Sequence, residues 1–342
     1  MTVSDDGAVF FRGTEVDVVE GLAPDRPYEL HGVAFATLPR PPGARLATVA
    51  TVNDVHFGEV ECGRVDGADV GPVLTAAEGA DPYPEVMNRA AAAEIAALCG
   101  GRGPDALVAK GDLTADGRPE EYAAFEACYR PPFGERLHVV LGNHDNQADH
   151  RAFDCPPVRR IDVPGAVLAV LDTSRPGEGG GRLSAEQLDW LDALAAEVAA
   201  DDPARPVLAF GHHPCLTGLP GEWTDAGAHL DPVDSGALAA VLACRPSIVG
   251  WFAGHTHRNR VGHRPETGPL PYVEVAATKD FPGSWAEYRV FEGGVLQVHH
   301  RVAAPAAVAW SEECRALVFG LYPRYALGDL ADRCFALPTP GG

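Results

Sequence analysis

The sequence predicts an α/β fold in which short buried strands alternate with helices along a large domain. Apolar runs that read as strands recur from residue 47 to residue 252, and Ala-rich or amphipathic helical segments lie between several of them. The composition, 46% hydrophobic and 22% charged, is that of an ordinary globular protein. At 342 residues the chain suffices for one large domain or two modest ones with an ample core.

The formal net charge of -21 argues against a nucleic acid polymer or an anionic membrane as the main partner. An anionic substrate would then need locally supplied positive charge, which metal ions can provide. No apolar run approaches the ~18 residues of a membrane-spanning helix, and residues 1–10 do not have the pattern of a signal peptide. The eight cysteines form no CxxC pair, so we expect buried thiols and a cytoplasmic location.

Residues 1–45 are expected to form a separate β-rich extension. Strand-like runs cover residues 8–11, 15–19 and 28–35, and Gly13 and a turn near residue 22 divide them. The turn and the Tyr-containing run after it resemble the last strands of a fibronectin-III-like module. The extension is too short for a whole sandwich, so we expect a few strands packed on the main body.

The main body is expected to contain strands, helices and one long insertion. The insertion, residues 57–84, is rich in Gly, Asp and Pro and is either a solvated loop or a substrate lid. Ser184 and Gln187 have the spacing of a capping box at the start of a helix. The predicted strands are 47–52, 106–109, 137–140, 167–171, 207–210, 248–252 and two late, antiparallel ones, 272–275 and 295–299; the other predicted helices are 84–99 and 119–128.

Five of these strands are followed at once by residue types that bind metals. Carboxyl ends of strands in one sheet lie close together, so these side chains can converge. Two carboxylates, an amide oxygen and several imidazoles suit two borderline metal ions rather than Ca²⁺. Two ions about 3.5–4 Å apart can contact both the attacking and the leaving oxygen of a phosphoryl transfer. The residues are Asp54 and His56, Asp112, Asn143 and His144, His212 and His213, and His255 and His257.

The order and spacing of these motifs resemble the calcineurin-like metallophosphoesterase superfamily. The motifs are Asp54-x-His56, Gly111-Asp112, Gly142-Asn143-His144-Asp145, His212 and Gly254-His255-x-His257. Residues 111–122, GDLTADGRPEEY, are similar to the branch of class III cyclic-nucleotide phosphodiesterases and bacterial glycerophosphodiesterases. The resemblance implies a four-layer α/β/β/α sandwich of two mixed sheets flanked by helices. We assign residues 46–305 to this catalytic domain and 306–342 to a C-terminal extension packed on the core.

The resemblance also implies a role for each residue of the motifs. Asp54, His56 and His257 would hold the first metal, and Asn143, His212 and His255 the second. Asp112 would bridge the two ions. His144 would face the phosphate as a catalytic residue that assists the leaving oxygen, while attack comes in line from a metal-bound hydroxide. His213, Asp145 and Asp172 are expected to support the site.

The function expected from this resemblance is dinuclear-metal-dependent hydrolysis of small phosphodiesters, either cyclic nucleotides or glycerophosphodiesters. Two metal ions, divalent or of mixed valence, are expected, and Mn, Fe and Zn fit the ligand set best. A phosphomonoesterase such as a nucleotidase stays open as an alternative, as does a non-catalytic binding protein of the same fold. C-terminal segments in this branch help to build dimers, which leaves a homodimer open.

The remaining histidines are not expected to bind metal. His138 is predicted to be a core residue, and His299 and His300 are predicted to be structural. Surface positions are expected for His150, His229 and His263, although His229 could approach the substrate. The aromatic residues between 310 and 335 are expected to pack onto the core.

Overall fold

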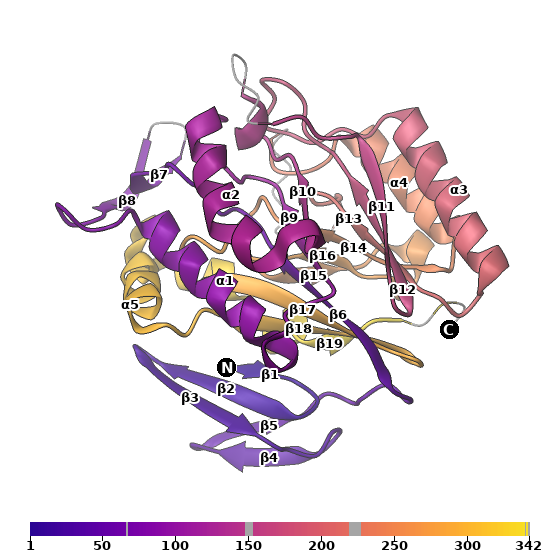
Figure 1. Ribbon diagram of the computed structural model, residues 1–342, viewed down its shortest axis with the longest axis horizontal. Coiled ribbons are helices and arrows are strands. Elements are labelled where there is room, and N and C mark those ends of the chain that lie inside the picture. The colour runs from indigo at the N-terminus through magenta and orange to yellow at the C-terminus, as the bar shows by residue number, and fades with distance from the viewer. Residues whose placement is uncertain (66–67, 148–152, 219–226, 339, 341–342) are drawn as a thin grey trace.

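The computed structural model describes residues 1–65, 68–147, 153–218, 227–338 and 340, and its centre is a pair of six-stranded mixed sheets (Figure 1). In the first sheet, β6, β9 and β10 run parallel to one another, and β17, β18 and β19 extend it through antiparallel pairs. Its strands, in spatial order, are β10 (Leu137–Val140), β9 (Ala106–Lys110), β6 (Arg45–Val52), β17 (Ser284–Phe291), β18 (Gly294–Arg301) and β19 (Phe335–Ala336).

The second sheet has four parallel strands at its centre and an antiparallel strand at each edge. The expectation that the strand near residue 272 is antiparallel was wrong, because this strand, β16, runs parallel to β14. After β14 the chain forms the short edge strand β15, reverses, and returns between the two. In spatial order the strands are β11 (Val158–Val163), β12 (Ala166–Leu171), β13 (Val207–Phe210), β14 (Ile248–Ala253), β16 (Tyr272–Glu274) and β15 (Arg260–Gly262).

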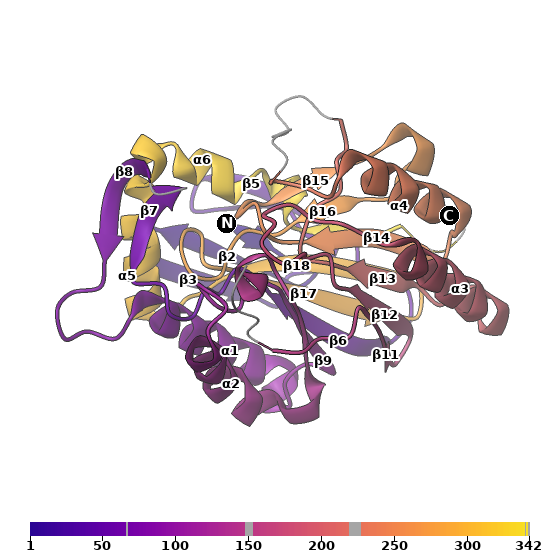
Figure 2. The ribbon, with the colours of Figure 1, turned by 90° about the horizontal axis from the view of Figure 1, so that it is seen from above.

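Each sheet is covered by a pair of helices on its outer face, which confirms the four-layer sandwich (Figures 1 and 2). Within β9, Val108 packs toward the other sheet and Leu107 toward the helices. Burial on both faces explains why the strands read as continuous apolar runs. The helices are α1 (Tyr83–Gly101) and α2 (Pro119–Phe133) on the first sheet, and α3 (Ala185–Asp201) and α4 (Pro232–Cys244) on the second.

The starts of two helices show how local sequence fixes the outer layer. Ser184 accepts a hydrogen bond from the Gln187 main chain at 3.3 Å and Gln187 bonds back to Ser184, so the predicted capping box of α3 is confirmed. Helix α4 was not predicted, although Asp231 caps it and Pro232 occupies its first position. An Asp-Pro pair before an Ala- and Leu-rich run is a helix signal that could have located it.

The N-terminal extension consists of a three-stranded sheet and a separate hairpin. The predicted single strand over residues 28–35 is instead the hairpin β4–β5, because His31 and Gly32 both have positive φ and form its turn. Arg289 of β17 contacts Asp5 and Asp6 and fastens the extension to the first sheet. The strands are β1 (Thr2–Val3), β2 (Gly7–Arg12), β3 (Glu15–Glu20), β4 (Pro27–Leu30) and β5 (Val33–Ala36). The domain boundaries stay a prediction.

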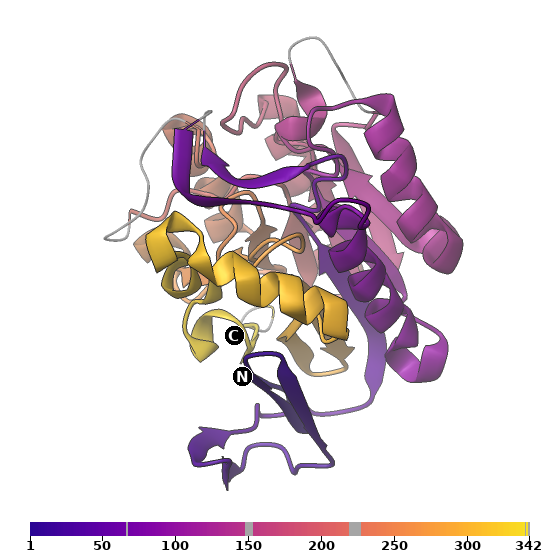
Figure 3. The ribbon, with the colours of Figure 1, turned by 90° about the vertical axis from the view of Figure 1, so that its left-hand side faces the viewer.

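The long insertion forms a hairpin, β7 (Glu61–Val65) and β8 (Ala68–Thr75), next to the C-terminal segment (Figure 3). The backbone at Gly71 lies so close to this segment that an added Cβ would stand 2.9 Å from the Phe319 nitrogen. The C-terminal segment contains α5 (Pro305–Glu313) and α6 (Tyr322–Leu327). Trp310 and Tyr322 are buried as expected, whereas Phe319 is 77% exposed.

Short 3₁₀ turns complete the fold, and one of them carries a predicted site residue, His144. In the described part of the chain, none of the helices combines the length and apolar character needed to cross a membrane. The turns are Gly134–Arg136, His144–Asn146, Pro265–Thr267, Cys314–Ala316, Val318–Gly320 and Leu330–Asp332.

Candidate metal centre

The residues singled out in the sequence come together at one edge of the sandwich, where strand ends from both sheets meet. The first sheet contributes the residues after β6, β9 and β10, and the second those after β13 and β14. Among the described residues, four overlapping groups of His and Asp have ligand atoms within 4.8 Å of one another, and they include six of the seven predicted ligands and His144. The seventh, Asn143, places Oδ1 3.2 Å from His212 Nε2.

The backbone at these strand ends is in a conformation that residues with side chains seldom adopt. Five predicted ligands have φ between 46° and 68°, each at a cost of about 1–3 kcal/mol. Such backbone persists only where the surrounding structure fixes it. The five are Asp54, His56, Asp112, His255 and His257. The strand ends are therefore shaped for the position of these side chains rather than for the stability of the turns.

The glycines of the motifs allow neighbouring strand ends to approach closely. A Cβ at Gly142 would stand 2.2 Å from Asp112 Oδ1, and a Cβ at Gly254 would stand 2.6 Å from Asp54 Oδ2. Real Cβ atoms do not come so close to an oxygen, so any larger residue would displace a predicted ligand. The glycines that precede Asn143 and His255 are thus packing requirements of the cluster.

We call Asp54, His56 and His257 the first half-site. The His257 imidazole lies between two carboxylates, with Nε2 3.5 Å from Asp54 Oδ1 and Nδ1 3.6 Å from Asp280 Oδ2. His56 has a similar arrangement, since its Nδ1 lies 3.5 Å from Glu59 Oε2 and its Nε2 faces the cluster. An outer carboxylate that orients a ligating imidazole is a common feature of protein metal sites.

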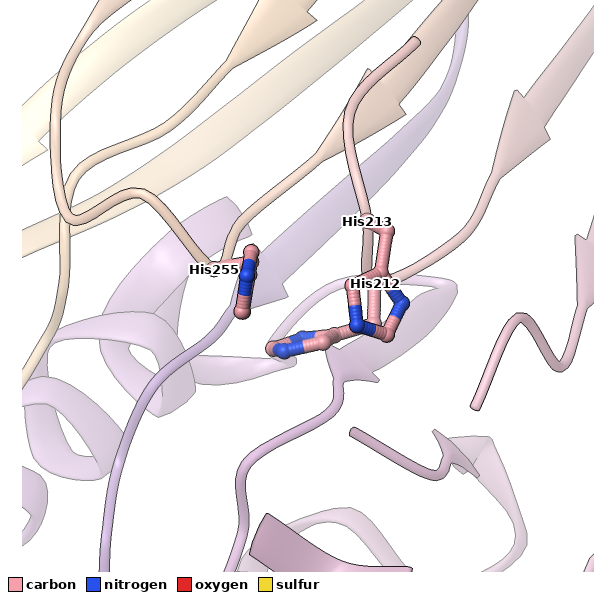
Figure 4. Close-up of side chains that lie close together, drawn as sticks. All are labelled: His212, His213 and His255. Carbon is pink, nitrogen blue, oxygen red and sulfur yellow. The ribbon is translucent and has the colours of Figure 1, made fainter. Parts of the chain in front are cut away.

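We call Asn143, His212 and His255 the second half-site. His212 donates a hydrogen bond from Nδ1 to the Lys110 carbonyl at 2.8 Å, which turns Nε2 toward Asn143. His255 donates from Nε2 to the Gly227 carbonyl at 2.6 Å, so Nδ1 is the nitrogen left for a ligand. The two rings approach each other from the ends of β13 and β14, with centroids 5.0 Å apart (Figure 4).

Asp112 lies between the two half-sites. Its Oδ2 is 3.3 Å from His212 Nε2 and 3.6 Å from His56 Nε2. Its Oδ1 accepts a hydrogen bond from the His144 main chain at 2.9 Å. Because it is buried and contacts an imidazole of each half-site, its carboxylate is in the position that a bridging ligand requires.

Two of the four imidazoles of the half-sites are held in the neutral form. Burial lowers the pKa of His56 well below its usual value, and the nearby Lys279 adds to this effect. Burial also lowers the pKa of His255 to about 4, with a smaller contribution from His212. A neutral imidazole is the form that binds a metal, so these residues are ready to bind at neutral pH.

The other two imidazoles are protonated at neutral pH in the metal-free site. Burial alone would lower the pKa of His212, but the carboxylate of Asp112 raises it to about 9. Burial likewise opposes the charge on His257, but Asp54 and Asp280 raise its pKa to about 10. These protons occupy the space between ligand atoms that a cation would take.

The donor atoms fit metal ions in both half-sites. Among the described residues, His56 Nε2 and His255 Nδ1 are buried and make no hydrogen bond, and each belongs to a different half-site. A buried nitrogen without a partner is costly unless something else satisfies it. Together with two carboxylates and an amide oxygen, these imidazoles form a set that borderline metals prefer.

His144 stands beside the cluster with one nitrogen already engaged. Its Nδ1 donates to the Ala115 carbonyl at 2.6 Å, which leaves Nε2 as the reactive nitrogen. Its ring lies edge-on to that of His56, with centroids 4.6 Å apart. The side chain is only partly buried, so a substrate can reach it. The arrangement can hold a proton next to a substrate oxygen.

Asp145 supports the site as expected. Its carboxylate accepts hydrogen bonds from the main chains of Gly142, Leu113 and Thr114 and from the Thr114 hydroxyl, at 2.7 to 3.1 Å. Burial and the nearby Asp112 raise the pKa of Asp145 to about 6. The carboxylate fastens the strand end that carries Asn143 to the one that carries Asp112.

His213 and Asp172 also have structural partners. His213 lies close to His212 and His255, but Thr173 Oγ1 is 2.8 Å from its Nδ1 and the Gly179 carbonyl is 3.1 Å from its Nε2. Both nitrogens are therefore engaged, which agrees with a supporting role. Asp172 accepts hydrogen bonds from the main chain and hydroxyl of Ser174 and shapes the turn after β12.

The other histidines differ in part from the expectations. His229 is buried rather than at the surface, because Gly181 and Pro214 hold the adjoining backbone. His138 is only partly buried, since β10 is the edge strand of its sheet. His299 is buried with its Nε2 2.6 Å from Ser284 Oγ, and His300 stacks on Trp285. The exposed His263 agrees with its prediction, and His150 lies outside the described residues.

Three supporting residues were missed in the sequence. Asp280 and Glu59 orient the imidazoles of the first half-site, and Lys110 is a fully buried lysine whose Nζ donates to the Ala253 carbonyl at 2.7 Å. Lys110 thereby joins the end of β9 to the end of β14, across the two sheets. Burial lowers its pKa to about 7. A charged residue at the end of an otherwise apolar strand is the signal that could have identified Lys110.

The fold and the site define a class of protein: an α/β/β/α sandwich with a cluster of metal ligands at the strand ends of both sheets. The model of the calcineurin-like phosphoesterase family matches residues 47–259, and the chain belongs to this family. The matched segment contains all seven predicted ligands and His144. Asp280 and α6 lie outside it.

Curated relatives agree with the branch inferred from residues 111–122. The chain is 34% identical over 164 residues to a cAMP/cGMP dual specificity phosphodiesterase of Mycobacterium tuberculosis. The matched segment covers 45% of this chain and 49% of the relative. It is 31% identical over 171 residues to the glycerophosphodiester phosphodiesterase GpdQ of Enterobacter lignolyticus, which covers 45% and 56%. The chain thus spans about half the length of the curated relatives it matches.

A solved structure shares the fold. A dimetal phosphatase from Danio rerio superposes with a TM-score of 0.57 at 16% identity and covers 76% of this chain and 98% of its own. At this identity the likeness speaks for the fold alone.

Proposed function

We propose that the protein is a dinuclear-metal-dependent phosphoesterase that hydrolyses small phosphodiesters. The observation that carries the proposal is the pair of half-sites on either side of Asp112, each with a buried imidazole nitrogen that makes no hydrogen bond. Asp54, His56 and His257 would hold one ion, and Asn143, His212 and His255 the other. When bound, the ions would supply the positive charge and the activated water that phosphoester hydrolysis requires.

The chain's own residues would then position the substrate and move a proton. Asp112 would keep the half-sites at a fixed separation. The Ala115 carbonyl holds His144 with Nε2 free, so His144 would donate a proton to the leaving oxygen or stabilise its charge. The partial exposure of His144 supports its access to a substrate.

The preference for diesters rests on the relatives, whose names describe cyclic-nucleotide and glycerophosphodiester phosphodiesterases. The test is a parallel assay of bis-p-nitrophenyl phosphate and p-nitrophenyl phosphate with Mn²⁺, Zn²⁺ or Fe²⁺ added to metal-free protein. We expect faster hydrolysis of the diester, followed by activity on cAMP or on glycerophosphodiesters. Faster hydrolysis of the monoester would favour a phosphomonoesterase, and no hydrolysis with two bound ions would favour a binding protein.

The metals, the assembly and the location are parts of the same proposal. Mn, Fe and Zn all fit the donor set, and their availability would decide between them. The eight cysteines form no CxxC pair in the sequence, which supports a reducing, cytoplasmic environment. A homodimer would be tested by light scattering of the metal-loaded protein.

A further inference from the structure

The loop 254–259, which carries both histidine ligands that follow β14, is held by helix α6. The Tyr325 hydroxyl donates to the Thr256 carbonyl at 2.7 Å, at the residue between the two histidines. At the end of the loop, the Asn259 main chain donates to the Ala326 carbonyl at 2.9 Å and its side chain does so at 3.1 Å. Helix α6 therefore contacts the loop at its middle and at its end, although it lies outside the family-matched residues 47–259.

A second path leads from α6 to an imidazole of the first half-site. The Tyr322 hydroxyl donates to Asp280 Oδ1 at 2.8 Å, and the other oxygen of Asp280 lies 3.6 Å from His257 Nδ1. Tyr322 and Asp280 are both buried. Lys279 lies 3.9 Å from the same carboxylate and also contacts Glu59, the partner of His56. The outer carboxylates of both imidazoles are thus joined through one lysine, and one of them is held by α6.

The backbone of this loop needs such support. His255 and His257 have φ of 68° and 53°, and residues in this region remain there only when the surroundings fix them. In the second half-site, by contrast, the partner that orients His212 is the carbonyl of Lys110, inside the family-matched segment. Among the described contacts, an α6 side chain reaches an imidazole through an outer carboxylate in the first half-site and not in the second.

We propose that the Tyr322 hydroxyl, acting through Asp280, orients the His257 imidazole and so sets the affinity of the first half-site for its metal. Tyr322 is a positioning residue, because it touches neither a ligand atom nor a substrate. The inference rests on the proposed function only in that both half-sites bind metal. It implies that the C-terminal extension contributes to metal binding by orienting a ligand.

The experiment measures the binding of Mn²⁺ alone to metal-free protein by calorimetry, for the wild type and for Tyr322→Phe. The variant keeps the ring and removes the hydroxyl. We expect two binding events in the wild type, and in the variant one of them weakened about 10–100-fold, the usual effect of losing an outer partner of a ligand. Asp280→Asn should weaken the same event. Tyr325→Phe should weaken both, because Thr256 lies between one ligand of each half-site.

Tyr122→Phe is the matched control. The Tyr122 hydroxyl also donates to a carboxylate, that of Glu126 at 3.0 Å, but Glu126 pairs with Arg130 and with no metal ligand. Both binding events should be unchanged in this variant.

The outcomes separate the inference from the proposed function. A wild type that binds no Mn²⁺ would overturn the proposed function and the inference with it. Two unchanged affinities in Tyr322→Phe would overturn the inference alone. It would also fail if both affinities fell together with the melting temperature of the metal-free protein, since that is the pattern of a general loss of stability.

Discussion

The two sheets contribute different chemistry to the same cluster. The strands of the first sheet end in every oxygen ligand of the proposed set, Asp54, Asp112 and Asn143, whereas the second sheet supplies imidazoles only. The two carboxylates of the first sheet also hold backbone: Asp54 accepts the main-chain N–H of His255 at 2.9 Å, and Asp112 that of His144. The carboxylates of the first sheet would therefore bind metal and also hold the neighbouring backbone in place. The histidines of the second sheet are instead oriented by surrounding groups, such as the Lys110 carbonyl and Asp280.

The largest loss of metal and activity is expected at Asp112, which would bind metal and also holds the His144 backbone. Asp112→Ala removes the proposed bridging ligand and the acceptor of the His144 N–H, so both metals and all hydrolysis should be lost. Metal content by mass spectrometry and the diester assay measure this. Asp112→Asn keeps an acceptor for the N–H and removes the charge, so it should lose metal with a smaller change in melting temperature. Two ions in Asp112→Ala would contradict the bridging role.

Replacing one imidazole from each sheet should divide the centre. His56→Ala should leave only the ion of the second half-site, and His212→Ala only that of the first, because in each variant the other half-site keeps all of its ligands. Metal analysis after removal of loosely bound ions by gel filtration checks the count. His263→Ala is the control, since this histidine is exposed and outside the cluster. Loss of both ions from either variant would mean that the half-sites are not separate.

His144→Ala tests the residue that the first sheet contributes without binding metal. Turnover should fall by roughly 10²–10⁴, the usual contribution of a general acid, while both ions remain. Steady-state kinetics on a diester with an alkoxide leaving group, together with metal content, check this. A leaving group that needs no proton, such as p-nitrophenolate, should show a smaller loss than an alkoxide. Unchanged turnover on both kinds of substrate would rule out proton donation.

The smallest expected difference between the sheets is in the protons that their histidines release when metal binds. In the metal-free protein, the pKa values of His212 and His257 are raised to about 9 and about 10, so both residues are charged at pH 7. Metal binding requires the neutral form, so loading at pH 7 should release about two protons per chain, both from the second sheet. Apparent affinity should therefore rise with pH and level off above pH ~10. Calorimetry in buffers of different ionisation enthalpy measures the release; none at pH 7 would contradict the assignment.

The central strands and the position of the proposed ligands directly after them could be predicted because both depend on local signals, whereas the four-layer arrangement came from the family resemblance. Buried parallel strands are continuous apolar runs, and the ligands follow them within a few residues, so neither depends on the details of packing. Elements at the edges of the fold have weaker sequence signals. Strand β15 has only three residues, and the hairpin β4–β5 has the pattern of one strand because its turn contains His31, which is not a typical turn residue. Asp280 could not be placed, because its role depends on a contact with His257 across the fold.

Lys110 fixes one distance in the metal centre, the separation of the two sheets at their strand ends. A lysine at the end of β9 whose Nζ reaches the carbonyl of Ala253 at the end of β14 fixes how far the two sheets stand apart at this edge. The half-sites draw ligands from both sheets, so this hydrogen bond would also help to set the distance between the two proposed ions. Lys110→Met keeps a side chain of similar length and removes the hydrogen-bond donor. It would break this link between the sheets and leave every proposed metal ligand unchanged.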